Sequence, residues 1–229
     1  MAQDGSSGLK LIGTWSSPYA IRARTALHLK SVAYDYVEEK DVLSAKSDLL
    51  LKHNPIHKKV PVLVHGDRSV CESLNIVQYV DEAWPSPPSI LPSDPYDRSI
   101  ARFWAQYIDE QCFSAITATA GAKDDEGRMA AAANLGSCLA VLEEGFKKCS
   151  KGGDFFGGDN IGLVDIACGS LLGPLWVIQR FSGVQFLRED STPSLVRWSE
   201  RFCGHDAVKP YMPTVDEFVE FAKKKFNVQ

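Results

Sequence analysis

Ser17 stands at a turn where a serine could hold an anion. A short apolar run, Leu9–Gly13, predicts a strand, and a helical pattern follows from Pro18 to about Lys30. A helix N-terminus carries free N–H groups and roughly half a positive charge, so an anion is stable there. The serine hydroxyl could donate a hydrogen bond to that anion. The alternative is that Ser17 only caps the helix.

A second segment, residues 54–63, reads Asn-Pro-Ile-His-Lys-Lys-Val-Pro-Val-Leu. Pro61 opens a strand after a basic loop, which leaves the backbone of Val60 available to pair with an extended peptide. An X-Pro bond in a tight functional turn is also the usual place for a cis peptide. The alternative is a solvated basic loop before an edge strand, and the residues themselves favour neither.

A third turn carries Cys71, Glu72 and Ser73 between a strand and a helix. The hydroxyl and the N–H of Ser73 could hold a carboxylate at the helix N-terminus, and Glu72 could hold an ammonium group. The alternative is a helix cap with an acidic first turn, which is common. Each of the three segments is a weak signal when it is taken singly.

The elements that must position these segments follow from hydrophobic periodicity. Strands are predicted at residues 9–13, 32–37, 60–65 and 69–71, with a hairpin at Gly66-Asp67, and helices at residues 18–30, 44–53 and 72–84. The order βαβαββα predicts an α/β, thioredoxin-like domain in which the three segments converge on one edge of the sheet. Together they would offer a thiolate site, a peptide clamp and sites for amino-acid termini, which match a small, anionic, peptide-like thiol.

The second half of the chain has a helical pattern almost throughout. Four prolines within residues 85–92 interrupt helix and strand alike and indicate a linker. Helices are predicted at residues 98–120, 126–150, 163–181, 193–203 and 214–226. The helix at 163–181 is apolar on all sides, so we expect it to lie buried at the centre. We therefore expect a thioredoxin-like domain at 1–84, a linker at 85–95 and an all-α domain at 96–229.

Composition weighs against several other functions. The 229 residues are 45% hydrophobic and carry a formal net charge of -4, which provides no basic field for nucleic acid. No apolar stretch approaches the ~20 residues of a membrane span, and the polar N-terminus lacks the features of a secretion signal. Six single cysteines and five histidines without ligand spacing indicate neither disulfides nor a metal site. We expect a cytoplasmic protein with no membrane or nucleic-acid partner.

The chain resembles the cytosolic glutathione transferases, most of all the plant tau class, from about residue 9 to residue 224. The resemblance is carried by residues 15–19 (Trp-Ser-Ser-Pro-Tyr), 54–63, 71–73, 101–104 (Ala-Arg-Phe-Trp) and 155–159 (Phe-Phe-Gly-Gly-Asp). It implies the cytosolic glutathione transferase fold, with an α/β thioredoxin-like N-terminal domain and an all-α C-terminal domain. It also implies a homodimer that uses glutathione as a co-substrate and needs no cofactor or metal.

The resemblance places the thiol of glutathione at Ser17, the catalytic residue, whose hydroxyl would donate a hydrogen bond to the sulfur. The backbone of Val60, before an expected cis Pro61, would pair with the cysteinyl unit. Arg22, one helical turn beyond Ser17, could help the electrostatics of the site or could equally lie at the surface. The family often has a proline directly before the active serine, whereas Ser16 stands there in this chain.

Charged and polar residues would bind the two ends of glutathione. By resemblance, Lys46 and Lys59 would bind the glycine carboxylate, while Glu72 and Ser73 would bind the γ-glutamyl end. The electrophile would bind in a pocket between the domains, and the resemblance assigns it Trp15, Tyr19, Tyr107, Gln111, Trp176 and Phe221. For each aromatic residue in this set, core packing is the alternative.

The resemblance implies an enzyme that conjugates the glutathione thiolate to hydrophobic electrophiles, in the detoxification of xenobiotics such as herbicides and in stress response. It also allows glutathione peroxidase activity. One alternative is a non-catalytic carrier of hydrophobic ligands or glutathione conjugates, which would use the same pocket. A thiol-disulfide or dehydroascorbate reductase would need a cysteine at the active turn, where Ser17 stands.

The helix predicted at 163–181 also has an expected anchor at its start. Gly162 takes the cap position and offers no side-chain oxygen, so Asp165, at the third helical position, should carry much of the local hydrogen bonding. Ile161 and Ile166 have the spacing of a hydrophobic staple. We expect the loss of the Asp165 carboxylate to destabilise the protein.

Overall fold

The computed structural model describes residues 8–40 and 45–226. The chain forms two compact units, which we call unit 1 (Met1–Ser89) and unit 2 (Ile90–Gln229). The boundary between them falls within residues 85–95, where the prolines are concentrated. Each unit has its own elements and its own core.

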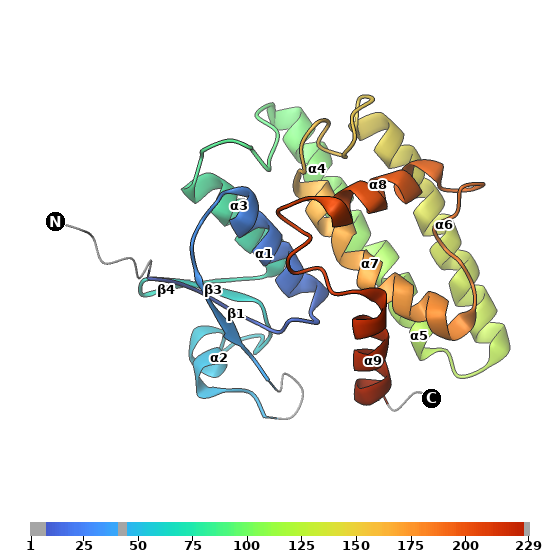
Figure 1. Ribbon diagram of the computed structural model, residues 1–229, viewed down its shortest axis with the longest axis horizontal. Helices are drawn as coiled ribbons and strands as arrows, with labels where there is room; N and C mark the ends of the chain where they lie inside the picture. Colours follow the sequence, from blue (N-terminus) through green and yellow to red (C-terminus); the bar gives the residue numbers. More distant parts are fainter. Residues whose placement is uncertain (1–7, 41–44, 227–229) are drawn as a thin grey trace. The chain divides into compact units, whose positions relative to one another are not determined.

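Unit 1 holds a mixed, four-stranded sheet of order β2-β1-β3-β4. Its elements are β1 (Leu9–Gly13), α1 (Pro18–Leu29), β2 (Asp35–Glu38), α2 (Asp48–His53), β3 (Val62–His65), β4 (Arg68–Cys71) and α3 (Ser73–Ala83). β1 is parallel to β2 and antiparallel to β3, and β4 forms a hairpin with β3. Figure 1 shows α1 and α3 on one face of this sheet and α2 on the other. The predicted order βαβαββα is confirmed.

The strand predicted at residues 32–37 is β2, which begins only at Asp35. The reason lies in the end of α1, where the N–H of Val32 donates to the carbonyl of Leu27 at 2.9 Å. This bond turns the chain out of the helix and uses the first residues of the predicted strand. The predicted bounds were therefore three residues too early at the start.

The helix predicted at residues 44–53 is shorter than expected. Residue 44 lies outside the described residues, and α2 begins at Asp48 because Ser47 is its cap, with the Ser47 Oγ accepting from the N–H of Leu50 at 3.1 Å. The helix still contributes to the core of unit 1. Leu50 is fully buried in a cluster with Ile12, Val62 and Val64.

The regular elements in the described part of unit 2 are all helices. Its elements are α4 (Pro95–Tyr107), a π-helical segment η1 (Ile108–Phe113), α5 (Ser114–Gly121), α6 (Asp125–Cys149), α7 (Leu163–Ser182), α8 (Pro193–Gly204) and α9 (Val215–Phe226). Residues 161–173 are all buried, and α7 contacts α4, α5, α8 and α9 (Figure 1). The expected buried central helix is confirmed up to residue 173, whereas half-buried and exposed positions appear from Pro174 to Ser182.

The single helix predicted at residues 98–120 is instead α4, η1 and α5 in sequence. It begins earlier than predicted because the Asp94 carboxylate accepts from the N–H groups of Tyr96 and Asp97, each at 2.9 Å. Its middle turn is π-helical, a form that is rare and often found at functional sites. Helical periodicity carries no signal for such a turn.

The proline-rich segment is hydrogen-bonded at both ends, its start to unit 1 and its later part to unit 2. The buried Lys30 Nζ donates to the carbonyls of Ser86 at 2.6 Å and Pro88 at 2.9 Å, which ties the start of the segment to unit 1. In unit 2, the N–H of Leu163 donates to the carbonyl of Ile90 at 3.0 Å. Much of the expected linker is therefore part of one unit or the other.

Gly169 marks a tight contact between α7 and α8. A Cβ at this position would lie 2.1 Å from the ring of Phe202, which is buried and stacks on Trp198 with ring centroids 5.3 Å apart. Gly169→Ala is expected to lower the free energy of unfolding by about 1–3 kcal/mol through overpacking. The shift of the urea midpoint measures it.

Gly136→Ala in α6 is the matched control, because an added Cβ there meets nothing within 4 Å. This change should stabilise the helix by up to about 1 kcal/mol, the usual gain of alanine over glycine in a helix interior. Equal effects of the two substitutions on the midpoint would contradict the packing argument.

Candidate functional site

The three segments singled out in the sequence lie at one edge of the unit 1 sheet. The strand register pairs Ile12 with Val62 and Val62 with Cys71. The turn after β1, the start of β3 and the end of β4 are therefore neighbours at the same edge. The predicted convergence of the three segments is confirmed.

Ser17 is the N-cap of α1, directly before Pro18. Its Oγ accepts from the N–H of Ala20 at 3.2 Å, and its own N–H donates to the carbonyl of Thr14 at 3.0 Å. The capping interpretation is therefore correct, but the hydroxyl proton can still be donated to an anion outside the helix. Ser17 is half-buried, whereas Ser16 is buried, and this favours Ser17 as the residue that meets a ligand.

The segment before β3 is a fixed loop. The Val60–Pro61 peptide bond is cis, as predicted. The buried Asn54 side chain spans the loop, because its Nδ2 donates to the carbonyl of Lys59 at 2.9 Å and its Oδ1 accepts from the N–H of His57 at 3.1 Å. The alternative is half right: residues 55–59 are exposed, but β3, the strand that follows them, lies between β1 and β4 and is not an edge strand. The bracing role of Asn54 was not anticipated from the sequence.

Glu72 has an unusual backbone at the start of α3. It is the N-cap residue with φ 70° and ψ 122°, in the left-handed region that a non-glycine residue rarely adopts, and its side chain makes no cap hydrogen bond. Such conformations cost about 1–3 kcal/mol and cluster at ligand sites. The alternative of a helix cap with an acidic first turn is therefore wrong, because α3 begins without a side-chain cap and has no acidic residue in its first turn.

Arg22 joins the first and third segments. Its side chain is fully buried, its Nη1 donates to the Oγ of Ser73 at 3.3 Å, and its guanidinium carbon lies 5.2 Å from the centroid of the Tyr19 ring. The surface interpretation of Arg22 is therefore wrong. A buried guanidinium between the N-termini of two helices adds positive potential at a place where both helix dipoles are already positive.

The two lysines assigned to the glycine carboxylate lie on separate segments. Lys46 is half-buried and directly precedes Ser47, the cap of α2, whereas Lys59 is exposed at the end of the loop that Asn54 braces. Their roles, and those of Val60, Glu72 and Ser73 toward glutathione, stay predictions.

The cysteines do not provide a reactive thiolate at this edge. Partial burial, followed by the charge of Glu72, raises the pKa of Cys71, and burial raises the pKa of Cys203 to about 11. All the cysteines in the described part of the chain are free thiols. This chemistry weighs against a thiol-disulfide reductase.

Neither a metal site nor a bilayer-spanning helix is found within residues 8–40 and 45–226. No cluster of three or more histidine, cysteine or acidic residues there could hold a metal ion. None of the helices described there is both long and apolar enough to cross a membrane.

The residues predicted to line the electrophile pocket are distributed over both units. Trp15 is exposed and Tyr19 half-buried, on either side of the Ser17 turn in unit 1. In unit 2, the half-buried Trp176 packs edge-to-face against α9, the helix that also carries the half-buried Phe221. These placements leave the four side chains partly accessible within their own units.

Tyr107 and Gln111 differ in their surroundings. The Tyr107 hydroxyl donates to the carbonyl of Cys138 in α6 at 3.2 Å, and its ring lies edge-to-face with Trp104 at 5.5 Å. These contacts favour the packing alternative for Tyr107. Gln111 is exposed within the π-helical η1 segment.

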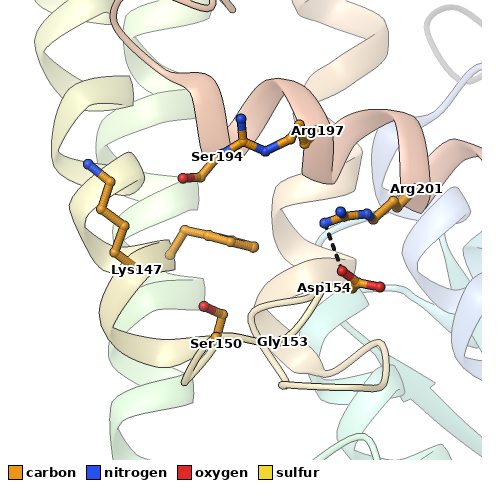
Figure 2. A pocket seen from close by; sticks show the side chains of 9 residues that line it. Lys147, Ser150, Gly153, Asp154, Ser194, Arg197 and Arg201 are labelled. Carbon is orange, nitrogen blue, oxygen red and sulfur yellow. Dashed lines mark ion pairs between the residues drawn. The ribbon is translucent and has the colours of Figure 1, made fainter.

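A polar cavity of about 340 Å³ lies within unit 2, between the ends of α6 and α8 (Figure 2). Its three cationic side chains are each paired with a carboxylate: Lys147 with Glu144 at 2.7 Å, Arg201 with Asp154 at 2.8 Å and Arg197 with Glu189 at 4.0 Å. Because carboxylates already balance these charges, the cavity presents no positive excess to an anion. We assign the candidate site to unit 1.

Known families match both units. Residues 11–88 match the family described as Glutathione S-transferase, N-terminal domain, and residues 103–206 match Glutathione S-transferase, C-terminal domain. Glutathione S-transferase U13 of Arabidopsis thaliana is 69% identical over 229 residues, which are 100% of both chains. Glutathione S-transferase U12 of the same plant is 67% identical over 100% of this chain and 90% of its own.

Solved structures agree with these matches. The tau class glutathione S-transferase of mango, Mangifera indica, has a TM-score of 0.92 and 52% identity, and covers 96% of this chain and 99% of its own. Rice GST1, solved in complex with glutathione, has a TM-score of 0.87 and 33% identity, and covers 97% of this chain and 100% of its own. The chain therefore belongs to the glutathione S-transferase family and, within it, to the tau class.

Proposed function

We propose that this chain joins the glutathione thiolate to hydrophobic electrophiles. The observation that carries the proposal is the Arg22–Ser73 hydrogen bond of 3.3 Å, which ties the N-terminus of α1 to that of α3 at the edge where β3 begins. Two helix N-termini and a strand opened by a cis proline offer sites for a thiolate, a carboxylate and a peptide backbone. A small anionic thiol peptide satisfies all three.

The site would act by stabilising the thiolate, which is the nucleophile. A free cysteine thiol has a pKa of about 8.5, and lowering it by roughly two units requires about 2.7 kcal/mol of preferential thiolate binding. The Ser17 hydroxyl, the N-terminus of α1 and the buried Arg22 charge would supply this together. The thiolate sulfur then attacks the electrophile by addition, or by substitution with loss of a leaving group.

The remaining site roles follow the same scheme. Lys46 and Lys59 would bind the glycine carboxylate, Val60 would pair with the cysteinyl backbone, and Glu72 and Ser73 would bind the γ-glutamyl end. Glutathione is then a co-substrate, and no cofactor is needed. Rice GST1, at 33% identity, was solved with glutathione bound, which supports glutathione as the ligand.

Relatives that are 60–69% identical over almost the whole chain are named as transferases, which favours the enzyme over the non-catalytic carrier. We place glutathione binding in residues 1–84 and most of the electrophile site in residues 96–229. Detoxification of xenobiotics, with glutathione peroxidase activity, belongs to this proposal. Free thiols suit a reducing compartment, and we propose the cytoplasm.

Turnover of a chloronitroaromatic with glutathione tests the function. We expect conjugate to form at a rate that depends on both protein and glutathione, followed by the absorbance of the product. A carrier would instead bind the aromatic compound, by displacement of a fluorescent hydrophobic probe, without forming conjugate. Binding without turnover would replace the transferase proposal by the carrier.

We also expect a two-fold homodimer, because soluble oligomers prefer closed symmetry and the resemblance implies contact between the α/β domain of one chain and the helical domain of the other. Sedimentation velocity at micromolar concentration should give about twice the 25.2 kDa mass of one chain. A single species with the mass of one chain would contradict this expectation.

A further inference from the structure

Two consecutive glutamates lie where β2, the outer strand of the unit 1 sheet, ends. This is the same edge of the sheet at which the candidate site lies. The register pairs Glu38, the last residue of β2, with Gly13, the last residue of β1. The next residue, Glu39, donates its N–H to the carbonyl of Gly13 at 2.6 Å. Successive side chains of an extended chain point to opposite sides, so this pair can reach two different parts of the site.

Glu38 holds the turn that leads to Ser17. Its Oε1 accepts from the Thr14 hydroxyl at 2.9 Å and from the Trp15 N–H at 3.2 Å. The Thr14 carbonyl in turn accepts from the N–H of Ser17 at 3.0 Å. Glu38 is exposed, so its two hydrogen bonds compete with water and each should have a modest effect.

Glu39 holds the start of α2. Its side chain is buried, with Oε1 accepting from the N–H of Ser47 at 2.9 Å and Oε2 accepting from the Ser47 hydroxyl at 2.6 Å. Ser47 is the cap of α2, and Lys46 precedes it directly. A buried carboxylate that accepts two bonds from one residue fixes the backbone to which Lys46 belongs, more firmly than an exposed one would.

We infer that Glu38 and Glu39 are positioning residues with separate effects: Glu38 holds the turn of the thiol site, and Glu39 holds Lys46 in place for the carboxylate of the thiol substrate. The inference rests on the proposed function. In this scheme neither glutamate touches glutathione; each acts through the backbone that it holds. Loss of Glu39 should therefore weaken glutathione binding, and loss of Glu38 should impair activation of the thiol.

The test compares Glu38→Ala, Glu39→Ala and their glutamine variants in the full chain. Glu39→Ala should raise the KM and the calorimetric Kd for glutathione about tenfold, the effect of losing a charge-assisted anchor. Its kcat should change less than about twofold, and the pKa of the bound thiol should change by less than about 0.3. Glu39→Gln should recover most of the affinity, because its amide oxygen can accept from the Ser47 N–H and its amide N–H can donate to the Ser47 hydroxyl.

Glu38→Ala should show the opposite pattern. We expect kcat to fall about three- to tenfold and the pKa of the bound thiol, measured by ultraviolet difference absorbance, to rise in proportion, with the KM for glutathione within about twofold. Glu38→Gln should restore kcat, since one amide oxygen can accept both donors. Glu82→Ala, which removes an exposed carboxylate from α3 in the same unit, is the control and should change neither parameter.

A double-mutant cycle tests whether Glu39 acts through Lys46. If it does, Glu39→Ala should add little to the KM of a Lys46→Ala variant. The inference would be overturned if the effects of Glu39→Ala and Lys46→Ala on KM were additive, or if the Glu38 and Glu39 variants changed only thermal stability. It would also be overturned if both alanine variants changed KM and kcat in the same way. In each of these cases the proposed function would still stand. A wild-type protein that neither binds glutathione nor forms conjugate would overturn both.

Discussion

Replacing Ser17 by alanine is expected to slow glutathione conjugation by at least about a hundredfold, the usual effect of losing one donor to a reactive anion. The Ser17 Oγ accepts from the Ala20 N–H at 3.2 Å, which leaves the hydroxyl proton for the thiolate. Without that proton, the pKa of the bound thiol should rise toward the free value of about 8.5. Initial rates and ultraviolet difference absorbance of the bound thiol measure the two effects.

The same substitution also removes the cap of α1, which should cost about 1 kcal/mol of stability. This loss is too small to unfold the protein, so a thermal melt separates it from the kinetic effect. Ser16→Ala is the matched control, because Ser16 is the neighbouring residue and is buried, with 7% of its surface exposed. If Ser16→Ala abolished conjugation and Ser17→Ala were nearly neutral, the assignment would be wrong by one residue. If neither mattered, the serine mechanism itself would fail.

Ser17→Cys is expected to replace glutathione conjugation by thiol-disulfide chemistry. A cysteine at a helix N-terminus has a lowered pKa and is itself a nucleophile. We expect this variant to form a mixed disulfide with glutathione and to gain reductase activity while it loses conjugation. Mass spectrometry after incubation with oxidised glutathione should detect the added glutathionyl group.

Local patterns were sufficient to predict which elements unit 1 contains and where its three segments meet. Alternating and helical periodicity fixed the order of the strands and helices, and Pro61 marked the cis bond. Convergence on one sheet edge followed, because strand order and direction determine which turns are neighbours. The chemistry of the segments could then be argued from two helix N-termini and from the free backbone of Val60 before Pro61.

The residues that hold this edge together could not be predicted in the same way. Arg22 is fully buried, although charged residues are almost never buried unless they are paired, and its partner Ser73 is 51 residues away. The hydrogen bonds of Asn54 and Glu39 are local, since they join residues three to eight positions apart, but the residue types alone do not show that these side chains turn back onto the nearby backbone. The π-helical turn at Ile108–Phe113 is not distinguished from an α-helix by hydrophobic periodicity.

Asp165→Ala is expected to lower the free energy of unfolding by at least about 3 kcal/mol, because each buried donor that loses its acceptor costs roughly 1–3 kcal/mol. The Asp165 carboxylate is fully buried and accepts four hydrogen bonds. Oδ1 accepts from the N–H of Phe156 at 2.8 Å and the indole N–H of Trp198 at 2.7 Å, and Oδ2 accepts from the N–H groups of Gly157 and Gly162, both at 2.9 Å. One side chain thus joins the 156–157 turn, the start of α7 and the middle of α8.

Asp165→Asn separates the role of charge and acceptors from the role of shape. Burial raises the pKa of Asp165 to about 6, so the group is a carboxylate at neutral pH. Asparagine fills the same volume, but whichever way its amide turns, the NH₂ group faces two N–H donors and leaves them without an acceptor. We therefore expect Asp165→Asn to be nearly as destabilising as Asp165→Ala, by the guanidinium midpoint at pH 7. Asp159→Asn, at an exposed position of the preceding loop, should stay within about 0.5 kcal/mol of the wild type. If Asp165→Asn kept the wild-type midpoint, the four donors would not be what holds α7 in place.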